Sequence, residues 1–267
     1  MSEHFPNAPL VELMVEVRWE AVSPVIDEPV DVGEEFSFDP VSDELFQTFG
    51  RKLAAAGYAR SERLSPAGFP APAGMPVYRF SSSEENENSI LFQIGSGILS
   101  VNAVPPYQSW SVFRPKAALA LETLLGSWGE DVRPDSFTKV TLRYINSFDD
   151  NFLAGRSRGS FLSDVLGFKL SIPPAYATHL SEETDRNVFL QFSSALNSGG
   201  RMAVRAGHAT VGNADAIVTD TTVSFSDAVS LDANQVLLLL DSGHEVASDT
   251  FIELTMDVQD ILRGDER

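Results

Sequence analysis

Two long segments with a period of two residues constrain the fold of this chain more than any other feature. In the segment from Leu10 to Trp19, one side is apolar and the other is mostly charged and carries Arg18. The segment from Phe137 to Phe148 alternates in the same way, with Arg143 opposite its apolar side. This period is typical of β-strands that bury one face. The chain therefore needs a sheet at its core.

Apolar periodicity and turn residues predict the elements around these two strands. Gly95-Ser96-Gly97 joins two apolar runs as a tight turn does, and Asn197-Ser198-Gly199-Gly200 joins two others. Asp232, three residues before Gln235, is placed to cap a long C-terminal helix. The predicted elements are helices over 43–56, 115–128 (with Pro115 in the first turn) and 232–262, hairpins over 90–104 and 188–206, and strands over 77–80, 168–172 and 216–225.

This order of elements predicts an α+β fold built from two related halves. We expect residues 1–150 to form the first half and residues 151–267 the second, each in the order strand, helix, hairpin, helix. The antiparallel strands of both halves would form one extended sheet, with the long helices packed on one of its faces. The two hairpins look alike in sequence, which is consistent with an internal duplication.

The last predicted helix carries an apolar seam that advances by alternating four and three residues. Its members are Ala247, Phe251, Leu254, Val258 and Ile261. Such a seam packs on another apolar surface. That surface is either the chain's own sheet or a second copy, so the oligomeric state stays open at this point.

The net negative charge of the chain favours some classes of binding partner and disfavours others. The formal net charge is −19, with 19 basic and 38 acidic residues, which disfavours nucleic acid because phosphates require clustered Lys and Arg. The acidic residues include a run that no Lys or Arg interrupts: Asp27, Glu28, Asp31, Glu34, Glu35 and Asp39. This run is either a solvated loop or a docking surface for a basic protein, such as a toxin or nuclease.

Several kinds of chemistry find no support in the sequence. The chain has no cysteine, which removes disulfides and thiolate metal sites, and none of the sequence patterns typical of catalytic or metal sites occurs. No apolar run approaches the roughly 20 residues of a membrane span, and the N-terminus lacks the pattern of a signal peptide. We therefore expect a soluble cytoplasmic protein without a cofactor, a metal, catalytic residues or membrane contact.

The two strand arginines are the best candidates for a ligand site. The planar guanidinium groups of Arg18 and Arg143 can bind an anion or carboxylate, with Tyr144 and Asn146 nearby. The alternative is a salt-bridge network with Glu12 and Glu16 on the same face of the sheet.

Aromatic residues gather in the segment before the second predicted helix. Tyr107 and Trp110 lie there within four residues of each other. They either line a cleft or a partner-binding surface, or close the end of the core where the helix docks.

Short segments of the sequence resemble, in order, the landmarks of one bacterial protein family. They are PNAPLVE at 6–12, EVRW at 16–19, LSVN at 99–102, YQSW at 107–110, FRP at 113–115, LRYIN at 142–146, and His244 with Phe251 in the last helix. This series resembles the TIGR04255 family, whose members are sporadically distributed among bacteria. The resemblance implies no particular reaction. A patchy distribution is typical of accessory genes, such as those for phage defence or toxin neutralisation.

Two functions follow as hypotheses. The first is a non-enzymatic accessory protein, antitoxin-like or immunity-like, that sequesters a basic protein through its acidic surface. The alternative is a module that binds an anionic or nucleotide-like small molecule in a groove lined by Arg18 and Arg143.

Overall fold

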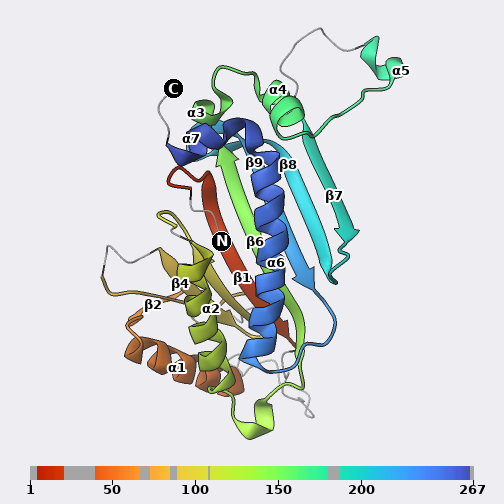
Figure 1. Cartoon of the computed structure of the whole chain (residues 1–267). Helices are drawn as coiled ribbons and strands as arrows, with labels where there is room; N and C mark the ends of the chain where they lie inside the picture. The colour runs from red at the N-terminus through yellow and green to blue at the C-terminus, as the bar shows by residue number, and fades with distance from the viewer. Residues whose placement is uncertain are drawn as a thin grey trace. The chain divides into compact units, whose positions relative to one another are not determined.

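The computed structural model describes residues 5–20, 40–66, 73–84, 89–107, 109–179 and 187–264. The strands of this part of the chain are β1 (Leu10–Trp19), β2 (Arg60–Arg63), β3 (Tyr78–Ser81), β4 (Ile90–Gly95), β5 (Ile98–Ala103), β6 (Phe137–Phe148), β7 (Phe189–Ala195), β8 (Arg201–Val211) and β9 (Ala214–Phe225). They form one antiparallel sheet in the order β2-β3-β4-β5-β1-β6-β9-β8-β7 (Figure 1). The predicted α+β fold is confirmed.

Three long helices and several short ones accompany the sheet. The long ones are α1 (Pro40–Ala55), α2 (Trp110–Leu125) and α6 (Ala233–Leu254). The short ones are α3 (Asp150–Leu153), α4 (Arg158–Ser160), α5 (Pro174–Ala177), α7 (Gln259–Arg263), the π-helical turn η3 (Phe161–Val165) and the 3₁₀ turns η2 (Glu130–Val132) and η4 (Met256–Val258). Among the described helices, none combines the length and the apolar character needed to cross a membrane.

The chain divides into two compact units made of interleaved segments. One contains residues 13–142 and 224–242, and the other contains residues 1–12, 143–223 and 243–267. β1, β6, β9 and α6 contribute residues to both. This division differs from the predicted halves, which were continuous in sequence.

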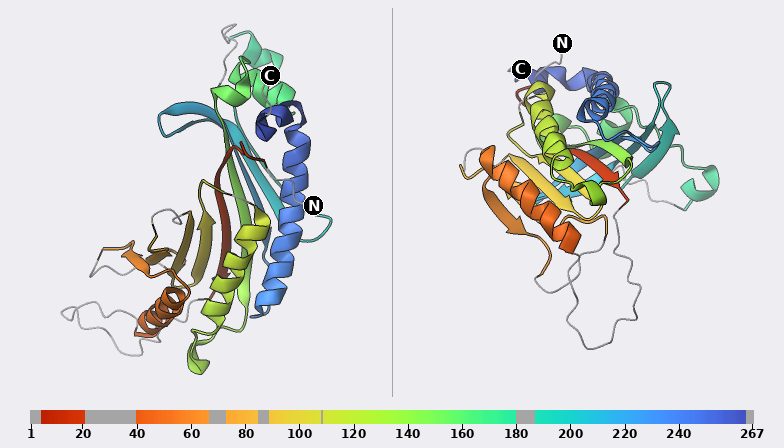
Figure 2. Two further views of the ribbon diagram at one scale, coloured as in Figure 1. Left: turned by 60° about the vertical axis from the view of Figure 1, so that its left-hand side comes forward. Right: turned by 90° about the horizontal axis from the view of Figure 1, so that it is seen from below.

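In the unit of residues 13–142 and 224–242, α1 and α2 pack on strands β3–β5 (Figures 1 and 2). The predicted first hairpin is confirmed, with Ile94 opposite Leu99 and the turn closed by Gly97 at φ 77°. Such a φ favours glycine, which has no Cβ to clash with the backbone. Aromatic rings fill the core between helix and sheet, as in the pair Phe49 and Phe80, whose centroids are 5.8 Å apart.

Helix α2 begins at Trp110, five residues before Pro115, which was predicted to lie in its first turn. Trp110 and Phe113 are both buried, so the first turn of the helix is anchored by apolar contacts. Pro115 lies inside the helix, where it removes one backbone N–H donor. Burial of the two aromatic side chains offsets the loss of this hydrogen bond. Helix propensity alone does not reveal that burial, so it places the start of the helix too late.

The unit of residues 1–12, 143–223 and 243–267 has its own core. Phe148, Phe161 and Leu166 are buried at its centre together with Ile217 of β9. The seam of the C-terminal helix packs on this core through Phe251, Leu254, Val258 and Ile261. Of the two surfaces that the sequence allowed, the chain's own core covers these four residues of the seam.

The predicted strand over 168–172 is wrong, because residues 167–173 form no regular structure. Phe168 packs against the core, whereas Leu170 is exposed. Alternating burial of this kind stabilises a strand only where a neighbouring strand accepts its backbone hydrogen bonds. The predicted long helix also stops early, at Leu254, although Asp232 does cap it by accepting hydrogen bonds from the backbone N–H of Asn234 and Gln235.

The strand order has an internal correspondence. β1 is followed in the sheet by β5, β4 and β3, and β6 is followed by β9, β8 and β7. Each series ends along the chain in a long helix, α2 or α6. In this order, the hairpin β8–β9 corresponds to the hairpin β4–β5, whereas the likeness in sequence is between β7–β8 and β4–β5. The second series begins at Phe137, not at residue 151 as predicted.

Candidate functional site

Each of the two strand arginines is held by a carboxylate of its own unit. Arg18 Nε donates to Glu16 Oε1 at 2.6 Å, and its Nη1 lies 3.4 Å from the Gly74 carbonyl oxygen. Arg143 binds Asp220 through two parallel hydrogen bonds of 2.8 and 2.7 Å. Such a paired fork is the preferred geometry between guanidinium and carboxylate. These contacts resemble the predicted salt-bridge alternative more than an open anion site.

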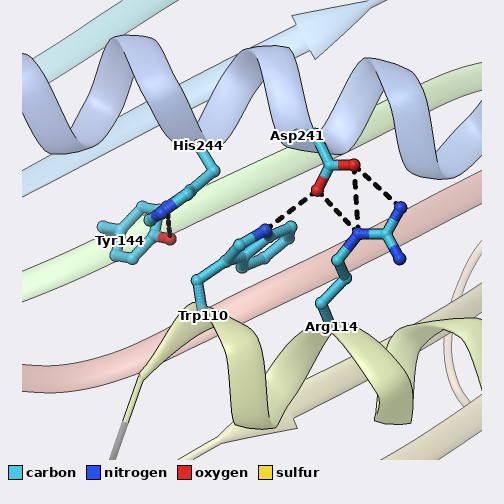
Figure 3. Close-up of polar contacts among 5 residues, drawn as sticks. All are labelled: Trp110, Arg114, Tyr144, Asp241 and His244. Atoms are coloured by element: carbon cyan, nitrogen blue, oxygen red, sulfur yellow. Dashed lines mark hydrogen bonds and ion pairs between the residues drawn. The ribbon is translucent and has the colours of Figure 1, made fainter. Parts of the chain in front are cut away.

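Strand alternation separates Arg143 from the other predicted ligand residues of β6. Tyr144 OH lies 2.7 Å from His244 Nδ1 of α6 (Figure 3). Successive side chains of a strand point to opposite faces, so Arg143 faces away from the side of Tyr144 and His244. Asn146 shares the face of Tyr144 and is buried. Within β6, Arg143 and the pair Tyr144 and Asn146 therefore lie on opposite faces of the strand.

Trp110 belongs to a polar cluster around Asp241 of α6. The indole N–H donates to Asp241 Oδ1 at 2.9 Å, while Arg114 Nε and Nη2 each donate to the carboxylate at 2.8 Å (Figure 3). The hydrogen bonds of Arg114 to Asp241, together with the negative charge of that carboxylate, raise the pKa of Arg114 above its ordinary value. A raised pKa stabilises the fold below that value and the effect is lost only above it, so this pair is insensitive to pH near neutrality.

The Asp241 cluster fastens the start of α2 to α6, and it fits a structural role. Trp110 is 7% exposed, so its N–H needs an internal acceptor. Sequence reasoning missed Arg114 and Asp241, which are 127 residues apart. Tyr107 lies half-buried ahead of α2.

The predicted partner surface lies outside the described residues. Asp27, Glu28, Asp31, Glu34, Glu35 and Asp39 all belong to the segment 21–39. Elsewhere in the described ranges, no group of three or more His, Asp or Glu side chains is arranged to hold a metal ion.

A polar groove that the sequence analysis did not predict lies between α4 and strands β7–β9. Its volume is about 460 Å³. Polar side chains dominate its lining, which includes Arg158, Asn187, His208, Thr210 and Asp215. All of them belong to the unit of residues 1–12, 143–223 and 243–267. The volume falls within the range of about 300–1,000 Å³ that small-molecule sites occupy.

Two of the lining residues each have a buried nitrogen without a hydrogen-bond partner. They are Arg158 Nε and His208 Nε2. Leaving a buried polar atom unpaired costs about 1–3 kcal/mol, so most native proteins avoid it and each case needs a physical explanation. An oxygen-bearing ligand in the groove, reached by a small side-chain rotation, would supply acceptors for these nitrogens.

Local structure holds Arg158 at the groove. Ser157 caps α4 by accepting a hydrogen bond from the Ser160 backbone N–H at 3.1 Å. The next residue, Phe161, is fully buried and anchors the turn in the core. Arg158 Nη2 then makes only long contacts, 3.3 Å to Asp150 Oδ1 and 3.5 Å to the Asp215 carbonyl oxygen.

The opposite side of the groove is built by strand alternation. Val204 and Ala206 of β8 are buried, so His208 and Thr210 extend the same face of the strand beyond the core. Thr210 Oγ1 donates to Asp215 Oδ1 at 3.1 Å and orients that carboxylate. The groove thus offers both a cation, Arg158, and a carboxylate acceptor, Asp215.

Comparison of the chain with protein-family models, with curated proteins and with solved structures found no match in any of the three. The resemblance to the TIGR04255 family therefore stays a prediction.

Proposed function

We propose that this chain is a cytoplasmic binding protein that holds a nucleotide-like anion in the groove between α4 and β7–β9. The observation that carries the proposal is the pair of unpartnered nitrogens, Arg158 Nε and His208 Nε2, at a polar groove of about 460 Å³. Arginine suits phosphate and carboxylate because its donors form a planar fork. The predicted ligand class is kept, but the groove is a different one from that proposed for Arg18 and Arg143.

The polarity of the groove narrows the ligand class. A phosphate or carboxylate next to Arg158 would accept hydrogen bonds from the guanidinium and from His208. Asp215 would repel a second anionic group but would accept from a hydroxyl or amino donor. A nucleoside monophosphate combines one anionic end with several such donors, and its size suits the groove. A purely anionic molecule, such as inorganic phosphate, would use Arg158 and His208 but not the Asp215 carboxylate.

The test is thermal denaturation of the purified protein with AMP, GMP, CMP, UMP and inorganic phosphate. A ligand at 100 times its Kd adds about 2.7 kcal/mol to the free energy of unfolding. For a chain of this size we expect the midpoint to rise by about 5–10 °C. Arg158→Gln should weaken binding at least about tenfold, since it removes a charged hydrogen-bond donor, while leaving the midpoint of the free protein close to that of the wild type.

Arg133→Gln is the matched control, because Arg133 is exposed and donates to the Leu231 carbonyl oxygen in the other unit. This variant should keep the full shift. Arg158→Lys, which retains the charge but not the fork, should bind with intermediate affinity. The proposal fails if none of these probes shifts the midpoint, or if Arg158→Gln and Arg133→Gln bind equally well.

Charge favours a second candidate function, the sequestration of a basic protein. Its supporting observation is the net charge of −19 with the uninterrupted acidic run in residues 27–39. Poly-lysine is the probe, titrated calorimetrically at low salt. Changing the six acidic residues of the run to Asn or Gln should weaken binding at least about tenfold, because exposed charges attract over about 10 Å at moderate salt.

The control for this titration neutralises six exposed acidic residues elsewhere: Glu44, Glu84, Glu122, Glu130, Asp249 and Asp257. It should bind nearly as well as the wild type. An equal loss in the two variants would assign the binding to net charge alone and would remove the run as a partner surface.

A further inference from the structure

A second, smaller pocket lies over strands β2, β3 and β4. Its volume is about 200 Å³, and it is lined by Arg60, Glu62, Arg79, Ser81 and Leu91. All five residues belong to the unit of residues 13–142 and 224–242. The pocket shares no lining residue with the groove at α4, so its chemistry can be considered independently of the function proposed for that groove.

Strand alternation places the polar side chains of this pocket on the side of the sheet opposite α1. The ring of Phe80 in β3 packs on α1. Arg79 and Ser81 flank Phe80 in the strand, so their side chains point to the other face. In the register of β3 with β2, Arg79 lies opposite Glu62 and Ser81 lies opposite Arg60. Two arginines, a carboxylate and a hydroxyl therefore meet on this face.

The guanidinium group of Arg79 is incompletely paired. Its Nη1 donates to Glu62 Oε2 at 3.3 Å, longer than the usual distance of about 2.7–2.9 Å for charged pairs. Its Nε is buried and has no hydrogen-bond partner in the described part of the chain. A buried donor without a partner is destabilising, and each such case needs a physical explanation.

The same protein shows what this edge of an arginine binds. Arg143 uses its Nε and Nη2 to hold both carboxylate oxygens of Asp220, and Arg114 uses the same two nitrogens to hold Asp241. Arg79 engages Glu62 through Nη1, which leaves the edge that contains Nε for another acceptor. A carboxylate would satisfy that edge after a small rotation of the half-buried side chain.

The rest of the lining narrows the class of carboxylate. Glu62 is exposed and can accept hydrogen bonds from a positively charged group, while Leu91 offers an apolar contact. An α-amino acid carries a carboxylate and an ammonium group on the same carbon. A volume of about 200 Å³ holds about six water molecules at liquid density, which suits a small amino acid better than a nucleotide.

We infer that this pocket binds a free α-amino acid with a small aliphatic side chain. Its carboxylate accepts hydrogen bonds from Arg79 and lies close to the positive charge of Arg60. Its ammonium group donates to Glu62, and its side chain contacts Leu91. Recognition requires both charges of the ligand, which distinguishes an amino acid from a simple carboxylate or a simple amine.

Isothermal titration calorimetry of the full chain tests this inference, with L-valine as the probe. We expect a Kd on the order of 10–500 µM. Isobutylamine, which is valine without its carboxylate, should bind at least about tenfold more weakly, because it loses the charged hydrogen bonds to Arg79. Isovalerate, which is valine without its ammonium group, should bind at least about threefold more weakly, because the contact with an exposed carboxylate contributes less.

Substitutions separate a binding role from a structural one. Arg79→Lys keeps the charge but loses the fork, and should weaken valine binding at least about tenfold. Arg51→Lys is the matched control, because Arg51 is exposed on α1 and donates to Thr48 Oγ1; it should bind valine as the wild type does. Glu62→Gln should abolish the preference for valine over isovalerate, whereas loss of a merely structural contact would weaken both ligands equally.

The groove variant Arg158→Gln should bind valine with unchanged affinity, so failure at one site is distinguishable from failure at the other. The inference is overturned if valine does not bind at about 10 mM, or if isovalerate or isobutylamine binds as tightly as valine. Equal affinities of Arg79→Lys and Arg51→Lys for valine would also overturn it, as would an unchanged preference for valine over isovalerate in Glu62→Gln.

Discussion

Phe161→Ala is expected to lower the free energy of unfolding by about 3–5 kcal/mol. The Phe161 side chain is fully buried in the core of its unit, and its ring lies 5.3 Å from that of Phe148. Removing the ring leaves a cavity that neighbouring fixed elements cannot fill. Because whole domains are stable by only about 5–15 kcal/mol, this loss should lower the midpoint of thermal denaturation by roughly 6–20 °C.

Chemical denaturation with urea measures this loss directly. Phe189→Ala is the control, because Phe189 is also a phenylalanine of this unit but is largely exposed, and it should change stability by no more than about 0.5 kcal/mol. The effect should also reach the groove, since Phe161 anchors the turn that carries Arg158. A loss below about 1 kcal/mol would show that this turn is not held by the core.

The fold was predictable from sequence where local pattern decides it. The hairpin over 90–104 follows from two apolar runs and a glycine, and both of its strands pair as expected. The strand over 168–172 failed because alternation does not reveal whether a neighbouring strand exists. The start of α2 was placed too late because the burial of Trp110 and Phe113 depends on tertiary contacts.

The candidate site was much less accessible to sequence reasoning. Arg158 and His208 are 50 residues apart and belong to no motif. A signal existed in β8, where the buried pattern of Val204 and Ala206 continues to His208, a polar residue on the apolar face. The partner of Arg143 was equally hidden, because Asp220 is supplied by a strand 77 residues later. The order of the strands in the sheet decides which distant residues meet at a site. The local periodicity of the sequence does not determine that order.

Gly95→Ala should be nearly as costly as loss of the core ring, for the opposite reason of crowding. A Cβ at Gly95 would lie 1.9 Å from the carbonyl oxygen of Met75, and the obstacle is backbone. The carbonyl would have to retreat by about 1 Å or more to restore van der Waals contact. The segment cannot retreat freely, because Val77 N–H donates to Ile94 O at 2.8 Å and Gly74 N–H donates to Ser96 O at 2.7 Å.

Overpacking costs about 1–3 kcal/mol, and each lost backbone hydrogen bond adds about 0.5–1.5 kcal/mol, so we expect a total near 2–5 kcal/mol. Hydrogen exchange locates the damage, because the amides of Gly74 and Val77 should lose protection before those of β5. Ser96→Ala is the control, since the hydrogen bond at that residue uses its backbone carbonyl and survives the change. Unaltered protection of both amides in Gly95→Ala would mean that the two segments do not approach closely.

The sequence pattern placed Gly95 in the hairpin turn. In the structure, the atoms that exclude a Cβ at Gly95 belong to Met75, 20 residues earlier. The constraint on this glycine therefore comes from tertiary structure.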